Sequence, residues 1–343
     1  MNTPLNEDLA MAHDHAPIAL SRRRWLAAAG ACLASTAGTA RAAGDIAGGR
    51  PITLVVSYPA GGGADVMARL VAPKLAEALG QPVVVENKPG ASGTIAAAQV
   101  ARAAPDGAML LLDASSFAVN PALFDKLPYD TATAFAPLAV LAQFPNVLVC
   151  TPGFEARSLA DVLRLARAQP GKLAYASSGN GSAQHLAGAL FEAMAKVEMT
   201  HIPYRGGGPA LNDVMGGQVP LFFANVASSL GHIQSGRLRP LAVTSKLRSR
   251  VLPDLPSMEE AGLKGYEVLE WNPVLAPAAT PAAVRAKLAA GLRKAMGDPE
   301  VLARVRALGG EVFGGGEAEA GRFLTAQQAL WGRVVRERRI TRE

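Results

Sequence analysis

The chain has 343 residues, half of them hydrophobic, with 34 Lys and Arg against 28 Asp and Glu and a net charge of +6. The basic residues form no stripe with interleaved aromatic residues, which argues against a nucleic acid as partner. Two cysteines and five histidines, none at metal-ligand spacing, lead us to expect no metal site and no cofactor. A chain of this length suits two domains better than one.

The first 42 residues have the pattern of an export signal. Arg22 and Arg23 precede a short, alanine-rich apolar run, and small residues at Ala40 and Ala42 suit a cleavage site. The apolar run is too short to span a membrane. We therefore predict a twin-arginine-type signal peptide over residues 1–42, cleaved near Ala42, and a periplasmic location. Cleavage would leave Cys150 as the one thiol, so no internal disulfide is expected.

The rest of the chain alternates between strand and helix patterns. An apolar stretch over 138–149 is interrupted at Phe144-Pro145, which predicts a break in the strand there. Such alternation predicts an α/β fold with parallel sheets covered by helices on both faces. The other expected strands are 52–57, 82–86, 108–113, 172–176, 200–203, 219–223 and 239–244, and the expected helices are 64–79, 95–103, 120–124, 158–168, 183–196, 206–215, 281–296, 299–308 and 317–336.

A glycine turn follows the first of these strands. Residues 58–65 read Tyr-Pro-Ala-Gly-Gly-Gly-Ala-Asp and lead directly into the first helix. Glycines let backbone N–H groups approach a ligand, and a helix N-terminus adds free donors and a partial positive charge. This turn therefore suits a carboxylate or phosphate. The spacing matches neither the dinucleotide fingerprint nor the phosphate loop, and a tight turn without a ligand remains the alternative.

Two further turns have the same chemistry. Residues 177–185 read Ser-Ser-Gly-Asn-Gly-Ser-Ala-Gln-His, with Ser182 as a natural N-cap, and the alternative is only a capped helix. His185 in the first helical turn is more often a hydrogen-bonding residue than a base. Around Tyr204-Arg205-Gly206, the arginine suits a carboxylate as a bidentate donor or is simply exposed. No nucleophile, base and orienting acid occur in a consistent arrangement, so an enzyme is not expected.

Taken together, these residues resemble one family. The matching segments include Tyr58–Arg69, Gly80–Ala91, Tyr175–Leu186, Pro203–Leu211 and Leu241–Ser245. In this order they are similar to the Bug-type extracytoplasmic solute receptors of tripartite tricarboxylate transporters. The resemblance covers nearly all of the chain from Pro51 to about Phe323. It departs from the usual pattern at Trp271-Asn272-Pro273, a segment expected to border the ligand cleft.

The resemblance implies a type II periplasmic binding protein, with two α/β lobes, a ligand cleft between them and two crossover strands. We expect lobe 1 to comprise residues 43–144 and 269–343, and lobe 2 residues 145–268. The crossings are expected near 143–150 and 265–275. The residues expected to contact a ligand are Tyr58, Ala60, Gly61, Gly62, Gly63, Asp65, Ser115, Ser178, Gly179, Asn180, Gly181, Ser182, His185, Tyr204, Arg205, Gly206 and Asn225.

The implied function is capture of a small carboxylated metabolite by hinge closure, followed by delivery to membrane permease subunits. The protein is expected to act as a monomer. The alternative is an extracytoplasmic sensing protein that presents its ligand to a signalling partner.

Overall fold

The computed structural model describes residues 46–337, 340 and 341. These residues belong to one compact unit, Gly44–Glu343. The predicted signal peptide lies outside the described residues. Within the described part of the chain, no helix combines the length and the apolar character that a membrane span requires.

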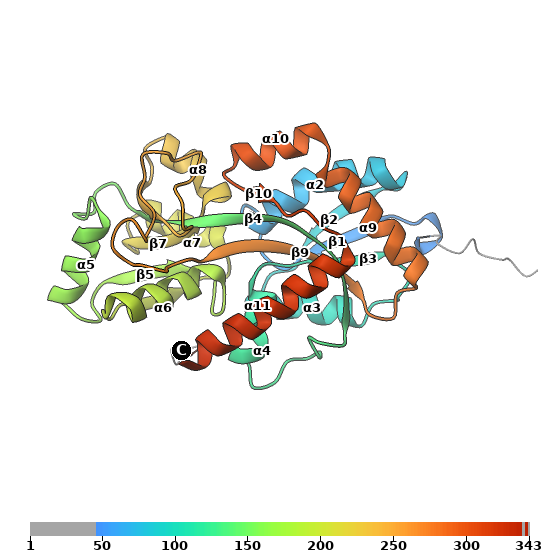
Figure 1. The fold of residues 1–343 in the computed structure, drawn as a ribbon, viewed down its shortest axis with the longest axis horizontal. Helices are drawn as coiled ribbons and strands as arrows, with labels where there is room; N and C mark the ends of the chain where they lie inside the picture. The colour runs from blue at the N-terminus through green and yellow to red at the C-terminus, as the bar shows by residue number, and fades with distance from the viewer. Residues whose placement is uncertain (1–45, 338–339, 342–343) are drawn as a thin grey trace, which may run out of the picture. The chain divides into compact units, whose positions relative to one another are not determined.

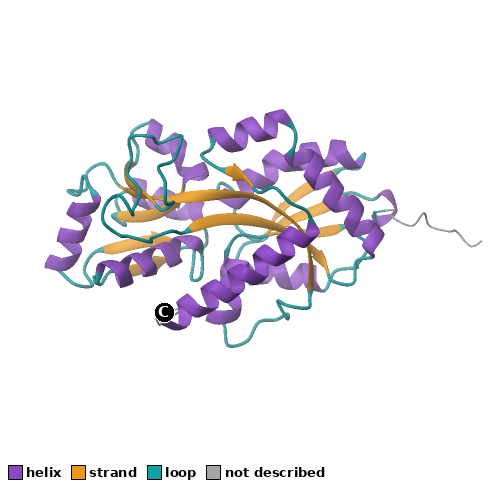
Figure 2. Cartoon of the chain, in the orientation of Figure 1, coloured by secondary structure: helices purple, strands orange, loops and turns teal. Residues whose placement is uncertain are grey.

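Lobe 1 is built around three parallel strands in the order β2-β1-β3 (Figures 1 and 2). Alternate side chains of β1 point to opposite faces, because successive residues of a strand do so. Leu54 joins the core formed with α2 and α9, and Val55 joins the core formed with α3 and α11. The elements of this lobe are β1 (Ile52–Val56), α2 (Gly63–Leu79), β2 (Val83–Asn87), α3 (Thr94–Ala101), β3 (Met109–Leu112), α4 (Ser116–Leu123), α9 (Ala282–Met296), α10 (Pro299–Ala307), β10 (Glu311–Val312) and α11 (Glu317–Glu337), with short 3-10 turns at Ala47–Gly49 and Ala91–Gly93.

Lobe 2 repeats this plan with the parallel strands β7-β5-β6. Phe223 of β7 packs into the core beneath α5 and α6, and Phe222 packs into the core beneath α7 and α8. Trp331 and Val335, near the end of α11, also join the α5/α6 core. The elements are α5 (Leu159–Ala168), β5 (Ala174–Ser177), α6 (Ala183–Ala195), β6 (Thr200–Pro203), α7 (Gly207–Met215), β7 (Leu221–Asn225), α8 (Val226–Gln234) and β8 (Arg239–Val243).

Two long strands, β4 (Phe135–Cys150) and β9 (Leu269–Pro277), connect the lobes (Figure 1). β4 pairs antiparallel with β9 as far as Pro145, opposite Leu269, and from Asn146 onward it pairs with β7. The predicted break at Phe144-Pro145 is therefore wrong. Proline is tolerated because Pro145 is the last residue of β4 that pairs with β9, at the end of that ladder. The exact lobe boundaries stay a prediction.

The other differences from the sequence-based elements have local causes. The short helix expected at 120–124 is the end of α4, which begins at Ser116, because Pro121 marked a false start. Helix α8 was not expected, since its serines and Gly231 lower helix propensity. Its N-cap, Asn225, was the available signal, and the Asn225 Oδ1 accepts a hydrogen bond from the Ala227 N–H at 2.8 Å.

Candidate functional site

Two adjoining cavities lie where the lobes meet. The outer cavity has a volume of about 420 Å³, which falls in the range of small-molecule sites. The inner cavity has a volume of about 20 Å³, enough for one water molecule. Both share Tyr58 from lobe 1 and Ser178 from lobe 2. The outer cavity is also lined by Gly90, Ala91, Ser92, Gly93, Phe124, Gly179, Asn180, Pro203, Tyr204 and Arg205, and the inner one by Gly62, Gly63, Ala64, Ala114, Ser182, Ala183, Gln184, Gly207, Asn225, Ser228 and Glu270.

Four helices begin at the inner cavity. The first residues of α2, α6 and α7 are Gly63, Ala183 and Gly207, and Asn225 caps α8. The first N–H groups of a helix have no partner within that helix and carry its positive end. The three glycine turns predicted from the sequence therefore lead into α2, α6 and α7, which all begin at the inner cavity. The site is chemically suited to an anion.

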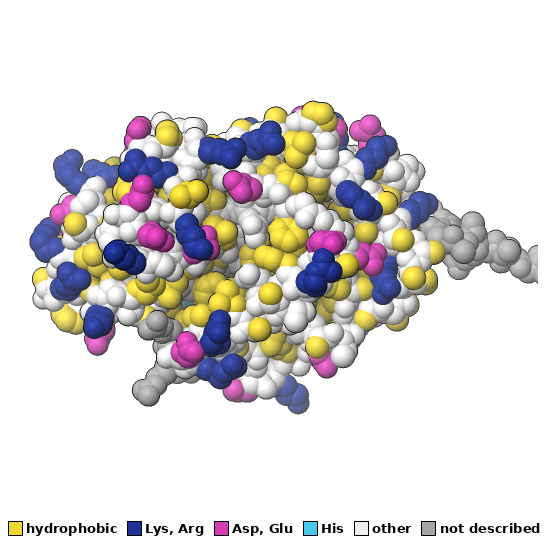
Figure 3. Space-filling view, viewed as in Figure 1, with side chains coloured by type: hydrophobic (Ala, Val, Ile, Leu, Met, Phe, Trp, Pro, Cys, Tyr) yellow, Lys and Arg dark blue, Asp and Glu magenta, His cyan; other side chains and the backbone are white. Residues whose placement is uncertain are grey.

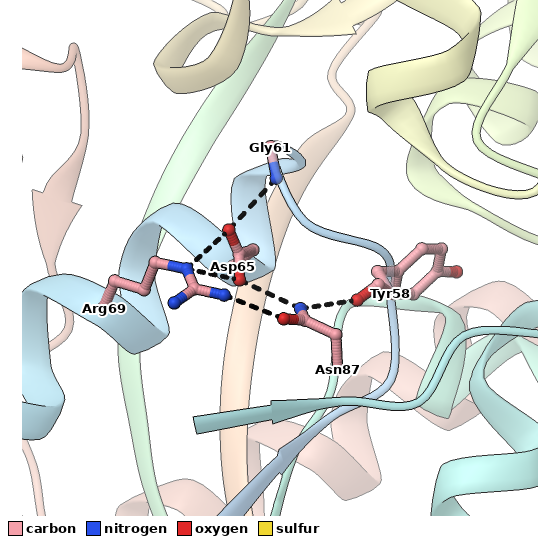
Figure 4. A network of polar contacts seen from close by, with 5 residues as sticks. All are labelled: Tyr58, Gly61, Asp65, Arg69 and Asn87. Atoms are coloured by element: carbon pink, nitrogen blue, oxygen red, sulfur yellow. Dashed lines mark hydrogen bonds and ion pairs between the residues drawn. The ribbon is translucent and has the colours of Figure 1, made fainter. Parts of the chain in front are cut away.

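Asp65 organises the first turn and lines neither cavity (Figure 4). Its carboxylate accepts hydrogen bonds from the Gly61 N–H at 3.0 Å, from Arg69 Nε at 2.9 Å and from Asn87 Nδ2 at 2.9 Å. Asn87 Nδ2 also donates to the Tyr58 carbonyl at 3.0 Å. Burial opposes ionisation, but the hydrogen bonds from Arg69, Gly61 and Asn87 outweigh it and lower the pKa of Asp65. Asp65 therefore holds residues 58–61 in position, directly through Gly61 and indirectly through Asn87.

His185 supports the second turn as Asp65 supports the first, by accepting a hydrogen bond from the backbone of the turn. Its Nδ1 accepts a hydrogen bond from the Gly181 N–H at 3.0 Å, and its ring stacks on His201 with centroids 4.1 Å apart. The His201 Nε2 lies 2.6 Å from the Ser177 Oγ. Burial lowers the pKa of His185 to about 4, and burial together with the neighbouring His185 lowers the pKa of His201 to about 3. Both rings are neutral at pH 7 and shape the turn that presents Ser178.

Some residues of the third turn line the outer cavity, and Gly206 instead lies in a contact between the lobes. Tyr204 and the exposed Arg205 line the outer cavity, and the Tyr204 hydroxyl donates to Asp213 at 2.7 Å. Gly206 instead forms a contact between the lobes, since a Cβ atom added there would lie 2.3 Å from Pro59 Cγ. Its φ of +131° also favours glycine.

The lobes touch at several further points. Ser92 Oγ donates to the Asn180 carbonyl. A Cβ added at Gly208 would lie 3.1 Å from the Ala60 carbonyl oxygen, and one at Gly181 would lie 2.8 Å from Leu123 Cδ1. The structure therefore brings lobe 1 and lobe 2 into direct contact around both cavities.

The structure places the predicted site residues in two groups. Ten of the seventeen line a cavity, and the other seven support the turns, the lobe contacts or the core. The first group is Tyr58, Gly62, Gly63, Ser178, Gly179, Asn180, Ser182, Tyr204, Arg205 and Asn225, and the second is Ala60, Gly61, Asp65, Ser115, Gly181, His185 and Gly206.

Sequence reasoning missed several cavity residues. The turn Gly90–Gly93 has the same glycine-rich composition ahead of a helix as the other turns, which was a usable signal. Glu270 and Gln184 had no local signal. Trp271 does not border the cleft: it is buried against Phe323, with ring centroids 5.0 Å apart, and the preceding Glu270 lines the inner cavity instead.

Asp113 is a buried carboxyl group at the end of β3, beside the site. Its Oδ1 accepts hydrogen bonds from Ser57 Oγ at 2.5 Å and from the Ala114 N–H at 2.7 Å. Ser115, two residues along, is also buried. Burial raises the pKa of Asp113 to about 6, although these two hydrogen bonds oppose the shift.

The raised pKa makes Asp113 a pH-dependent stability element. The folded state binds this proton more tightly than the unfolded state, where the pKa is about 3.9. Its stabilisation is therefore complete below pH 3.9 and is lost as the pH rises through about 6. We expect Asp113→Asn, measured by urea unfolding at pH 5 and pH 7, to reduce the loss of stability between these values by about 1.3 kcal/mol. Asp125→Asn, on the surface, is the control, and equal losses in wild type and Asp113→Asn would contradict the assignment.

A larger cavity of about 960 Å³ lies on the opposite face of the crossing strands. Gln143, Pro145 and Leu269 line it, and they alternate with Phe144, Asn146 and Glu270, so the two sets point to opposite sides. Its charged residues are partly paired, with Arg248 Nε 2.9 Å from Glu260 and Lys246 Nζ 3.6 Å from Glu267. None of the glycine turns reaches this cavity, which makes it the weaker candidate for an anionic ligand.

Positive and negative side chains are interspersed over the face shown in Figure 3. That face carries no extended region of one charge. The prediction that nucleic acid is not a partner remains a prediction, and this distribution agrees with it.

Comparisons with known proteins add independent observations. The sequence model of TctC, the tripartite tricarboxylate transporter family receptor, matches residues 67–340. The chain is 38% identical over 323 residues to the UPF0065 protein in the tcbD-tcbE intergenic region of Pseudomonas sp. strain P51, covering 94% of this chain and 96% of that protein.

Two solved structures are similar to this chain in both sequence and fold. The periplasmic binding protein BugD superposes with a TM-score of 0.82 at 35% identity, covering 85% of this chain and 98% of BugD. The structure of R. palustris Rpa4515 with adipate gives a TM-score of 0.83 at 36% identity, covering 85% of this chain and 98% of that protein.

Proposed function

Because this chain belongs to the tripartite tricarboxylate transporter family of receptors, we propose that it captures a small carboxylated metabolite between its lobes and delivers it to a membrane permease. The observation that carries the proposal is the convergence of four helix N-termini on the inner cavity, beside an outer cavity of ligand size. Adipate, present in the structure of the similar Rpa4515, is a dicarboxylate and supports the same ligand class.

Capture begins with one carboxylate at the first glycine turn. The start of α2 and Ser178 both line the inner cavity, and Ser178 also lines the outer one, so a carboxylate held where the two cavities meet is bound by both lobes. Each charge-assisted hydrogen bond contributes on the order of 1.5–3 kcal/mol. Several such bonds suffice for micromolar affinity after the costs of ordering.

Hinge closure then excludes water. β4 and β9 are the two connections at the crossing, and a small bend in each would separate the surfaces that touch at Gly206 and Pro59. The ligand favours the closed form because only that form offers donors from both lobes. The closed monomer, exported to the periplasm after signal cleavage near Ala42, is the form that docks on the permease.

The test is a double substitution on the two walls of the site. Gly62→Val with Ser178→Val should abolish the rise in Tm that wild type shows with carboxylates, because it fills the inner cavity and removes a hydroxyl donor. A Cβ at Gly62 meets only the Pro59 carbonyl oxygen at 3.5 Å, so the fold should tolerate the first change. Thermal-shift titration with a carboxylate library provides the measurement.

The matched control places the same two changes away from the site. Gly153→Val with Ser235→Val alters exposed positions of lobe 2 and should keep the full ligand-induced rise in Tm. Equal ligand-induced shifts in wild type and in Gly62→Val/Ser178→Val would refute the proposed site.

A further inference from the structure

Glu270 is a buried carboxylate in a cleft suited to anions. It lies on the crossing strand β9, opposite Phe144 of β4, and is 5% exposed. Its side chain lines the inner cavity together with residues from the starts of α2, α6, α7 and α8. A carboxyl group of the protein therefore lies beside the place where we locate the ligand carboxylate.

No cation of the protein neutralises this group. Gln184 Nε2 donates a hydrogen bond to the Glu270 Oε2 and another to the Asn146 Oδ1 at 3.0 Å. Among the described residues, no Lys or Arg forms an ion pair with Glu270. Burial raises the pKa of Glu270, and the neighbouring side-chain amides of Gln184 and Asn225 partly offset this shift. A buried charge normally has a partner of opposite charge, and a ligand group in the inner cavity can supply one.

The size of the inner cavity fits a small cationic group. Its volume of about 20 Å³ accommodates one water molecule, and a protonated amino group is of similar size. The outer cavity, which shares Tyr58 and Ser178 with the inner one, has room for the remainder of a small metabolite. An amino group in the inner cavity would thus reach Glu270, while the adjacent carboxylate lies beside Tyr58 and Ser178, where the two cavities meet.

We infer that Glu270 binds the protonated amino group of the ligand, and that the solutes are therefore amino-carboxylates rather than plain dicarboxylates. This inference rests on the proposed function and narrows its ligand class. Glu270 is a binding residue that determines specificity: it attracts an N–H donor and disfavours a second carboxylate at the same point.

The test compares acids that differ only by one amino group. Isothermal titration uses succinate and L-aspartate, glutarate and L-glutamate, and adipate and L-2-aminoadipate. Wild type should bind the amino member of at least one pair at least about tenfold more tightly, the gain of one charge-assisted hydrogen bond. Glu270→Gln, which keeps the shape but removes the charge, should reduce that ratio to about one or reverse it. Glu267→Gln, near the surface and on the other side of the strands, should leave the ratio unchanged.

The outcomes separate the two proposals. If wild type binds the plain dicarboxylates as tightly as, or more tightly than, their amino partners, the inference is overturned while the carboxylate receptor stands. A preference for amino acids that persists in Glu270→Gln overturns the role of Glu270. Absence of binding to any carboxylate overturns the proposed function and the inference with it. The wild-type comparison decides the ligand class even if Glu270→Gln does not fold.

Discussion

Gly206→Ala is expected to weaken ligand binding by about a hundredfold or more while leaving each lobe folded. The new Cβ would lie 2.3 Å from Pro59 Cγ and 2.4 Å from Pro59 Cδ, which belong to the other lobe. Carbon atoms do not approach so closely, so the lobes must separate before the side chain fits. If binding requires their contact, a loss of this size corresponds to about 3 kcal/mol. Isothermal titration with the best ligand of a carboxylate screen measures the loss.

The control for this prediction is Gly217→Ala. Gly217 also has a positive φ, +74°, but a Cβ there meets no atom within 4 Å. That variant also places alanine at a positive φ but makes no lobe contact, so its affinity should equal that of wild type. Wild-type affinity in Gly206→Ala would mean that the contact of Gly206 with Pro59 is not needed for binding.

Gly188→Ala should lower the free energy of unfolding by about 3 kcal/mol. Gly188 lies within α6, and a Cβ atom there would approach Tyr175 Cε2 to 2.1 Å and Cζ to 2.3 Å. Tyr175 cannot move aside, since it is 1% exposed, stacks on His201 and packs edge-on against Phe223. Overpacking of a core costs typically 1–3 kcal/mol, and this contact is a severe case. Urea unfolding measures the change.

Gly231→Ala separates this packing effect from helix propensity. Gly231 lies within α8, where a Cβ meets no atom within 4 Å. Alanine should stabilise that helix by up to about 1 kcal/mol. If Gly188→Ala raised the unfolding midpoint as Gly231→Ala should, the close packing of α6 on Tyr175 would be disproved.

The comparisons confirm the two-lobed periplasmic binding protein fold and a receptor rather than an enzyme. Strand, glycine turn and helix could be read from the sequence because each depends on neighbouring residues. Helix α6, for example, begins where Ser182 caps it, with the Ser182 Oγ accepting from the His185 N–H at 3.2 Å. The signal peptide, the lobe boundaries and the monomeric state stay predictions.

Side-chain roles at the site were harder to predict. Asp65 was expected to contact the ligand because its turn resembles a ligand-binding loop of the family, yet Arg69 and Asn87 bind its carboxylate. Asn87 lies 22 residues away in the sequence, and only the pairing of β2 with β1 places it there. The sequence pattern predicted the turn correctly but could not predict which of its residues line the cavity.

The sequence by itself determined where backbone donors are free, since glycine content, N-caps and the 3.6-residue period act within a few residues. The tertiary structure alone decided that those donors meet at one cavity and that Glu270 lies among them. Glu270 and Gln184 are 86 positions apart, and no local pattern links them. Their contact exists because β9 crosses between the lobes beside the start of α6, a consequence of long-range strand pairing.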